Sequence, residues 1–194
     1  MFMENTQMKN NGDTHNAYHL LLNNPQLHSS KKTLYLVGGT MGVGKTTTCQ
    51  ILKTKLPNSV FLDGDWCWDM HPFQVTDETK QMVMENICYQ LNNFLRCSAF
   101  DNVIFCWVMH EQPIIDDLLR RLTLGSCRVT PISLVCSEQA LVKRLKKDVD
   151  AGLRSPDVIE RSVKRIPLYQ RLNTLKIDVS ELGPDEVAGL IAKL

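Results

Sequence analysis

Residues 33–48, TLYLVGGTMGVGKTTT, contain the most informative pattern of the sequence. It joins a short apolar run to a glycine-rich turn and then to a segment with the length of a helix. The turn carries the pattern GxxxxGK[ST] as Gly39-Thr40-Met41-Gly42-Val43-Gly44-Lys45-Thr46. A strand, this spacing and a helix in succession predict a P-loop, in which glycines let backbone amides approach phosphate oxygens and the helix offers its positive end to the same anion.

The P-loop predicts a site for a nucleoside triphosphate, which we take to be ATP, together with Mg²⁺. Lys45 is expected to bridge the β- and γ-phosphates, and the Thr46 hydroxyl is expected to bind Mg²⁺. The residues expected to surround the phosphates are Gly39, Thr40, Met41, Gly42, Val43, Gly44, Lys45, Thr46 and Thr47. The alternative is a glycine-rich turn that only joins a strand to a helix, which the fixed spacing and the correct flanks disfavour. The motif does not identify the molecule that receives the phosphate.

Apolar runs alternate with amphipathic segments along the rest of the chain, as in βαβ units. Five short strands are expected, at residues 33–37, 60–62, 102–108, 129–136 and 175–179. Helices are expected at residues 45–56, 76–97, 113–122, 137–150, 156–172 and 184–193. Capping residues or prolines mark several helix starts, namely Thr76, Pro113, Ser137, Pro156 and Pro184. The predicted fold class is α/β, a three-layer P-loop NTPase fold with a five-stranded parallel sheet, flanking helices and a short helical lid.

Composition narrows the possible partners and settings. The 22 basic and 21 acidic side chains nearly cancel, so no overall field favours nucleic acid or an anionic membrane surface. No apolar run approaches 18 residues, and the first residues lack the apolar core of a signal peptide. Seven cysteines without a CxxC pair fit neither a disulfide framework nor a zinc site, so we expect a reducing, cytoplasmic location. The sequence gives no indication of the oligomeric state.

A second motif, FLDGD at residues 61–65, lies at the end of the second predicted strand, where open α/β sheets place their ligand crevice. The segment resembles the Asp-Gly-Asp of gluconate kinases and adenylylsulfate kinases and the Asp-x-Asp of shikimate kinases, which are P-loop small-molecule kinases. This resemblance implies that Asp63 and Asp65 lie beside the γ-phosphate, help to arrange Mg²⁺ and accept the proton of the attacking hydroxyl.

An extended segment would point both carboxylates the same way, so they could share one site. Asp65 is favoured as the base and Asp63 as the metal-side partner, although the two could exchange roles. The alternative is a solvent-facing turn, a common use of Asp and Gly.

A cationic segment, residues 137–165, is expected to form a lid over the triphosphate. Leu141, Leu145 and Val149 recur every four residues and form one apolar stripe. In nucleotide-kinase-like folds, an Arg-Leu pair entering the lid supplies an arginine that packs on adenine or touches phosphates, and Arg144 with Leu145 matches that pair. The same resemblance places residues 180–183 beside the base. Further candidates for the phosphates are Arg154, Arg161 and Arg165, with a solvated basic face as the alternative.

The acceptor side is rich in aromatic residues but poor in positive charge. Residues 66–73 could line an acceptor pocket or cover the core, and His110 with Glu111 could read the acceptor or cap the next helix. Between Asp65 and Asp117 the only basic residues are Lys80 and Arg96, whereas enzymes that phosphorylate nucleoside monophosphates hold the second phosphate with arginines.

These observations predict that residues 1–32 form a polar tail or arm and that residues 33–194 form a P-loop kinase domain. The expected activity is transfer of the γ-phosphate of ATP to a hydroxyl of a small-molecule acceptor: a nucleoside, a sugar or polyol, or an antibiotic-like compound. Two alternatives remain, a nucleoside monophosphate kinase and a nucleotide-binding regulatory ATPase or switch. Neither nucleic acid nor membrane is expected as a partner.

Overall fold

The computed structural model describes residues 32–194, and the predicted tail lies outside this range apart from Lys32. Five parallel strands form one sheet in the order β2-β3-β1-β4-β5. They are β1 (Thr33–Gly38), β2 (Ser59–Asp63), β3 (Asn102–Cys106), β4 (Arg128–Val135) and β5 (Leu175–Asp178). Each lies within two residues of a predicted strand, and the α/β fold class is confirmed.

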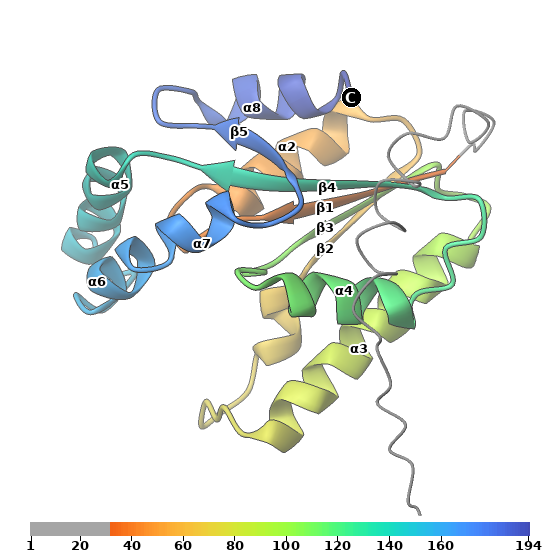
Figure 1. Cartoon of the computed structure of the whole chain (residues 1–194), viewed down its shortest axis with the longest axis horizontal. Coiled ribbons are helices and arrows are strands. Elements are labelled where there is room, and N and C mark those ends of the chain that lie inside the picture. Colours follow the sequence, from red (N-terminus) through yellow and green to blue (C-terminus); the bar gives the residue numbers. More distant parts are fainter. Residues whose placement is uncertain (1–31) are drawn as a thin grey trace, which may run out of the picture.

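Helices cover both faces of the sheet and extend beyond its carboxyl edge (Figure 1). One face packs on α3 (Asp77–Arg96) and α4 (Gln112–Arg121), and the other packs on α2 (Lys45–Lys55) and α8 (Pro184–Ile191). Beyond the ends of the strands lie α5 (Glu138–Asp150) and α6 (Val158–Val163), and α7 (Ile166–Gln170) follows them. This arrangement places the loops that follow β1, β2 and β3 at one edge of the sheet.

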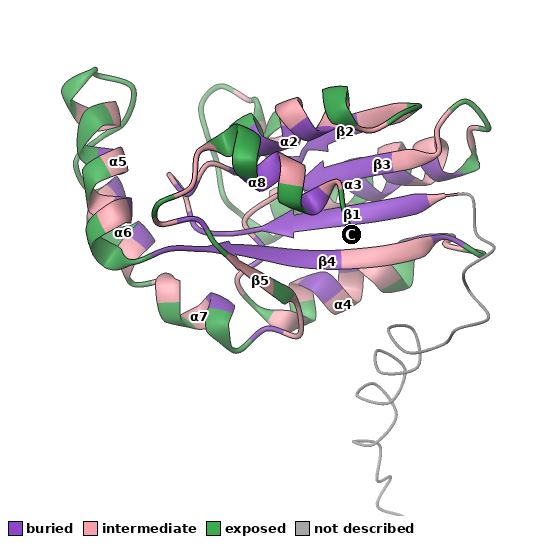
Figure 2. Ribbon diagram, turned by 90° about the horizontal axis from the view of Figure 1, so that it is seen from above, coloured by how far each residue is buried: buried purple, intermediate pink, exposed green. Residues whose placement is uncertain are grey.

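Residues of alternate orientation in β1 belong to different hydrophobic clusters, because successive side chains of a strand point to opposite faces. Leu34 and Leu36 pack with α3 and α4, whereas Tyr35 and Val37 pack on the side of α2 and α8. Figure 2 shows the resulting buried central strands, with exposed residues concentrated on the outer faces of the helices. The central strand that carries the P-loop is therefore fixed by packing from both sides.

Helix starts follow the predicted capping chemistry. Thr76 accepts a hydrogen bond from the amide of Thr79 at 3.1 Å, and Ser137 accepts one from the amide of Ala140 at 3.2 Å. One prediction is wrong: a single helix over residues 156–172 is replaced by α6 and α7. Pro167 has no amide hydrogen with which a continuous helix could bond the carbonyl oxygen four residues earlier, so a new helix starts with this proline in its first turn.

Among residues 32–194, no helix combines the length and the hydrophobicity that a membrane span requires. All seven cysteines lie in this range as free thiols.

Candidate active site

The P-loop joins β1 to α2 at the carboxyl edge of the sheet. Gly44 precedes α2 with a φ of 102°, a backbone conformation that favours glycine, and no side chain caps the first turn of the helix. The first turn also contains no acidic residue. Its amides and the positive end of the helix are consequently available to an anion, as the sequence predicted.

Lys45 is folded back over its own loop. Its Nζ donates hydrogen bonds to the carbonyl oxygens of Gly39 at 2.9 Å and Thr40 at 3.1 Å, and the residue is buried. Burial lowers the pKa of Lys45, while nearby acidic groups, among them Asp65 and Asp63, act in the opposite direction. A bound triphosphate would offer this ammonium group charged oxygens in place of the two carbonyls.

The two predicted metal ligands touch one another. The Thr46 hydroxyl donates to Oδ2 of Asp63 at 2.6 Å, and the other carboxylate oxygen of Asp63 accepts from the amide of Asp65 at 3.0 Å. Asp63 is only 4% exposed. A hydroxyl and a carboxylate beside a triphosphate loop fit Mg²⁺, which takes one or two protein oxygens and completes its shell with phosphate and water.

The backbone at Asp65 is not extended, as the sequence predicted, but helical. Residues Gly64–Trp68 form a short 3-10 helix, η2, with Asp63 as its N-cap, so the expected extended segment is wrong. The cause is the bond from the Asp65 amide to Asp63, which closes a turn.

The acidic pair nevertheless remains close to Lys45. The Asp65 residue as a whole is exposed, yet partial burial of its carboxyl group is the main cause of its raised pKa. Repulsion from Asp63 raises the pKa further, whereas Lys45, Arg154 and Trp107 lower it. The structure therefore brings Lys45, Thr46, Asp63 and Asp65 together.

Arg144 lies between the P-loop and the loop after β5. Its guanidinium donates to the carbonyl oxygens of Val43 at 3.4 Å, Ser180 at 3.3 Å and Val179. It also lines a pocket of 490 Å³ with the predicted base loop Ser180–Gly183, together with Ser137, Gln139, Ala140, Lys143 and Lys147. Since its donors serve main-chain carbonyls, this geometry favours the base-packing role of Arg144 over contact with phosphate.

The other three lid arginines have different environments. Arg161 forms an exposed ion pair with Asp157 at 2.8 Å, as expected of a solvated helix face. Arg154 pairs with Asp148 at 3.1 Å and is close enough to Asp65 to lower its pKa. Of the three, Arg154 is thus the one whose charge acts on Asp65.

Arg165 lies near His110 on the rim, and burial and this arginine lower the pKa of His110. Glu111 is the N-cap residue of α4, but its side chain makes no capping hydrogen bond. It lies 3.6 Å from His110 instead, so the predicted capping role of the pair is not observed.

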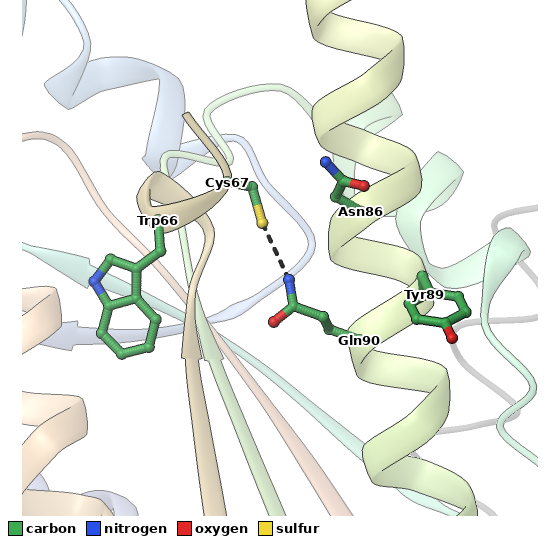
Figure 3. Close-up of a pocket in the computed structure, with 5 residues that line it drawn as sticks. All are labelled: Trp66, Cys67, Asn86, Tyr89 and Gln90. Atoms are coloured by element: carbon green, nitrogen blue, oxygen red, sulfur yellow. Dashed lines mark hydrogen bonds between the residues drawn. The ribbon is translucent and has the colours of Figure 1, made fainter. Parts of the chain in front are cut away.

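The aromatic segment after Asp65 divides between packing and a pocket. Trp66 packs edge-on against Phe61 with ring centroids 5.3 Å apart, and Trp68 packs on Phe73 at 5.9 Å. Between η2 and α3 lies a pocket of 340 Å³ lined by uncharged residues, namely Trp66, Cys67, Asn86, Tyr89 and Gln90. In Figure 3, Cys67 and Gln90 point toward one another across this gap, where the Gln90 carboxamide donates to the sulfur at 3.4 Å.

The lid helices are attached to the P-loop by contacts that the sequence did not predict. The Thr40 hydroxyl donates to the carbonyl oxygen of Ser162 in α6 at 2.9 Å. Gly42 lies against α5 so closely that an added Cβ would be 2.7 Å from Cγ of Leu145. No local pattern could reveal these contacts, because the residues are far apart along the chain.

Comparison with known proteins places the fold in context. Residues 36–161 match the model of the family described as AAA domain, which covers more than half of the chain. The chain belongs to this AAA domain family. The match includes the P-loop, the acidic pair and the helices α5 and the start of α6, while the base loop after β5 lies outside it. No curated protein matches the sequence significantly.

Solved structures show the same fold at low sequence identity. The tunicamycin resistance protein of Deinococcus radiodurans is 18% identical, with a TM-score of 0.59, over 84% of this chain and 94% of that one. A gluconokinase from Sinorhizobium meliloti is 16% identical, with a TM-score of 0.57, over 84% and 95%. Shikimate kinase from Aquifex aeolicus is 16% identical, with a TM-score of 0.52, over 82% and 93%. The predicted resemblance to P-loop small-molecule kinases is therefore confirmed at the level of the fold.

Proposed function

We propose that this protein transfers the γ-phosphoryl group of ATP to a hydroxyl group of a small, uncharged acceptor. The observation that carries the proposal is the contact between the P-loop hydroxyl of Thr46 and Asp63, with Asp65 on the next turn and Lys45 beside both. A P-loop alone is compatible with either a nucleotide-dependent switch or a kinase. An acidic pair within reach of the same loop favours a kinase, because a carboxylate there can accept the proton of an acceptor hydroxyl.

Each residue has a defined task in this mechanism. Lys45 binds the β- and γ-phosphates, and Thr46 and Asp63 would hold Mg²⁺, which neutralises phosphate charge when bound. Asp65 accepts the proton as the acceptor oxygen attacks the γ-phosphorus, and the bond from that phosphorus to the bridging oxygen of ADP breaks. Arg154 offers positive charge from the lid to the transferred group.

The charges around the acceptor side support an uncharged substrate. Lys80 is paired with Asp77 at 3.1 Å, and Arg96 donates to Asn93 at 2.6 Å, so both basic residues predicted for this half are already engaged. The pocket beside η2 has no charged residue in its lining. A second phosphate group would thus have to be held by arginines of the lid. Seven free thiols are in keeping with the expected cytoplasmic setting.

An acceptor panel tests the proposal. ADP release from ATP and Mg²⁺ is measured with nucleosides, sugars and polyols, uncharged antibiotics that carry a hydroxyl group, and nucleoside monophosphates as separate groups. Release that depends on a hydroxyl compound supports the proposal. Turnover of monophosphates alone would establish a nucleoside monophosphate kinase, and ATP hydrolysis that no acceptor accelerates would favour a regulatory ATPase.

Asp65→Asn separates transfer from binding. Removal of the base should lower the transfer rate about 10²–10⁴-fold while the affinity for ATP stays the same. Asp69→Asn is the matched control, since Asp69 is an exposed carboxylate at the end of η2 and should keep full activity. Equal rates for Asp65→Asn and Asp69→Asn would rule out Asp65 as the base.

A further inference from the structure

The pocket between η2 and α3 begins one residue beyond Asp65. Trp66 and Cys67 form its η2 side, and consecutive Cα atoms of a chain are about 3.8 Å apart. The other side of the pocket belongs to the neighbouring helix α3 (Figure 3). The pocket and the proposed base therefore lie within the length of a single small molecule.

Trp66 gives the pocket an aromatic wall. Its ring packs edge-to-face with Phe61, with ring centroids 5.3 Å apart, and Phe61 is buried in β2. Trp66 is nevertheless 53% exposed. The contact with Phe61 thus anchors the indole to the core and leaves much of it uncovered. A flat ring can stack on such a surface, and nucleobases stack on aromatic side chains in this way.

Helix α3 gives the pocket its hydrogen-bonding groups. Asn86 and Gln90 are four residues apart, so their carboxamides lie on the same side of the helix. Gln90 donates to the sulfur of Cys67 at 3.4 Å, and within residues 32–194 the carboxamide of Asn86 makes no hydrogen bond. A carboxamide offers a donor and an acceptor side by side, which is the pattern that matches the edge of a nucleobase.

The distribution of polar groups distinguishes between uncharged acceptors. A sugar or polyol carries a hydroxyl on nearly every carbon, and each buried hydroxyl needs a hydrogen-bond partner. This pocket offers only two carboxamides and the hydroxyl of Tyr89. A nucleobase has two apolar faces and polar groups only at its edge, which complements one aromatic wall and one polar wall. The volume of 340 Å³ is near the lower end of the range for ligand sites, about 300–1,000 Å³, and so favours a nucleoside over a larger antibiotic.

We propose that the pocket between η2 and α3 binds a nucleoside as the phosphate acceptor, with Trp66 against the face of the base and Asn86 and Gln90 at its edge. A hydroxyl oxygen of the sugar then forms the new bond to the γ-phosphorus, the bond from that phosphorus to ADP breaks, and the hydroxyl proton passes to Asp65. The proposal rests on the proposed function, since it names the acceptor of that reaction.

Kinetics with adenosine, guanosine, cytidine and uridine test the acceptor. At least one of them should accelerate ADP release from ATP and Mg²⁺. Trp66→Leu should raise KM for that nucleoside about 10- to 100-fold, the effect of lost stacking, and Trp66→Phe should restore most of the affinity. Gln90→Leu should raise the same KM about tenfold. KM for ATP should stay unchanged in all three variants.

Gln81→Leu is the matched control for Gln90→Leu. Gln81 lies on the same helix, is exposed and bonds to Glu85, so its loss should leave KM for the nucleoside unchanged. Turnover of sugars or polyols but of no nucleoside would overturn this inference and leave the proposed function standing. A nucleoside KM that neither Trp66→Leu nor Gln90→Leu alters would also overturn it.

Protection of a thiol tests the pocket without any activity. Of the seven cysteines, Cys67 and Cys97 are partly exposed and the other five are buried. A bound nucleoside should slow the alkylation of Cys67 by iodoacetamide, measured by mass spectrometry, and leave that of Cys97 unchanged. Trp66→Leu should abolish this protection. If none of the four nucleosides protects Cys67, the inference is overturned. If the protein phosphorylates no acceptor, the proposed function fails, while the protection of Cys67 still decides whether the pocket binds a nucleoside.

Discussion

Substitution of Gly42 by alanine should uncouple the P-loop from the lid. Gly42 has a φ of 79°, and left-handed backbone costs a residue with a side chain about 1–2 kcal/mol. The new methyl group would also be 2.7 Å from Cγ of Leu145, which is fully buried and cannot turn outward. Overpacking of this kind costs about 1–3 kcal/mol. The free energy of unfolding should therefore fall by about 2–5 kcal/mol.

Thermal and urea unfolding measure this loss. For a domain of this size, each kcal/mol lowers Tm by about 2–4 °C, so Gly42→Ala should lower it by about 4–20 °C. Gly125→Ala is the matched control: Gly125 also has positive φ, at 54°, but a Cβ there would meet nothing within 4 Å. Gly125→Ala should therefore lose only the part of the unfolding free energy that comes from left-handed backbone, about 1–2 kcal/mol. If Gly42→Ala were no less stable than Gly125→Ala, the proposed contact between the P-loop and α5 would be refuted.

Three further predictions concern the same region. Thr40→Val should cost about 1 kcal/mol of unfolding free energy, because it removes the bond to the Ser162 carbonyl. Ser162→Ala should cost nothing, since the buried Ser162 hydroxyl has no hydrogen-bond partner among residues 32–194. Chemical denaturation compares the two, and a greater loss in Ser162→Ala would contradict this assignment. Arg144→Lys should raise the Kd for ATP about tenfold, because lysine cannot bridge the Val43 and Ser180 carbonyls with one planar group. Calorimetry measures this Kd, and an unchanged value would exclude the base-packing role of Arg144. Burial lowers the pKa of His110 in the folded state, so stability is full above about pH 6.5 and declines below it as the unfolded chain takes up the proton. Denaturation between pH 5 and 8 should show a smaller decline in His110→Gln, and equal declines would oppose it.

Local features explain why much of the site could be predicted. The spacing from Gly39 to Thr46 is a backbone pattern, and the strand before it and the helix after it are encoded in neighbouring residues. Asp63 ends a buried strand, so its side chain had to lie at the carboxyl edge beside the P-loop. Its bond to Thr46 follows from the topology of the sheet rather than from anything special in either residue.

The backbone conformation between Asp63 and Asp65 could not be predicted in the same way. An alternating strand pattern suggested that it continues the direction of Asp63, but a single hydrogen bond to Asp63 turned the chain into η2. Trp107 occupies the space beside Gly64, so the turn has no room for a side chain at that position. The sequence marks Trp107 only as the end of an apolar run.

The P-loop, the parallel sheet around it and the acidic pair at the end of β2 are encoded locally, because periodicity and short spacings act between neighbours along the chain. Tertiary packing settles the choices that local patterns left open: the charge of Arg154 rather than of Arg161 acts on Asp65, Arg144 donates to main-chain carbonyls, and Trp107 leaves no room for a side chain at position 64. These choices depend on contacts between distant residues, as for Thr40 and Ser162, which are 122 positions apart. Such contacts arise only when packing of the whole core has fixed where each helix lies.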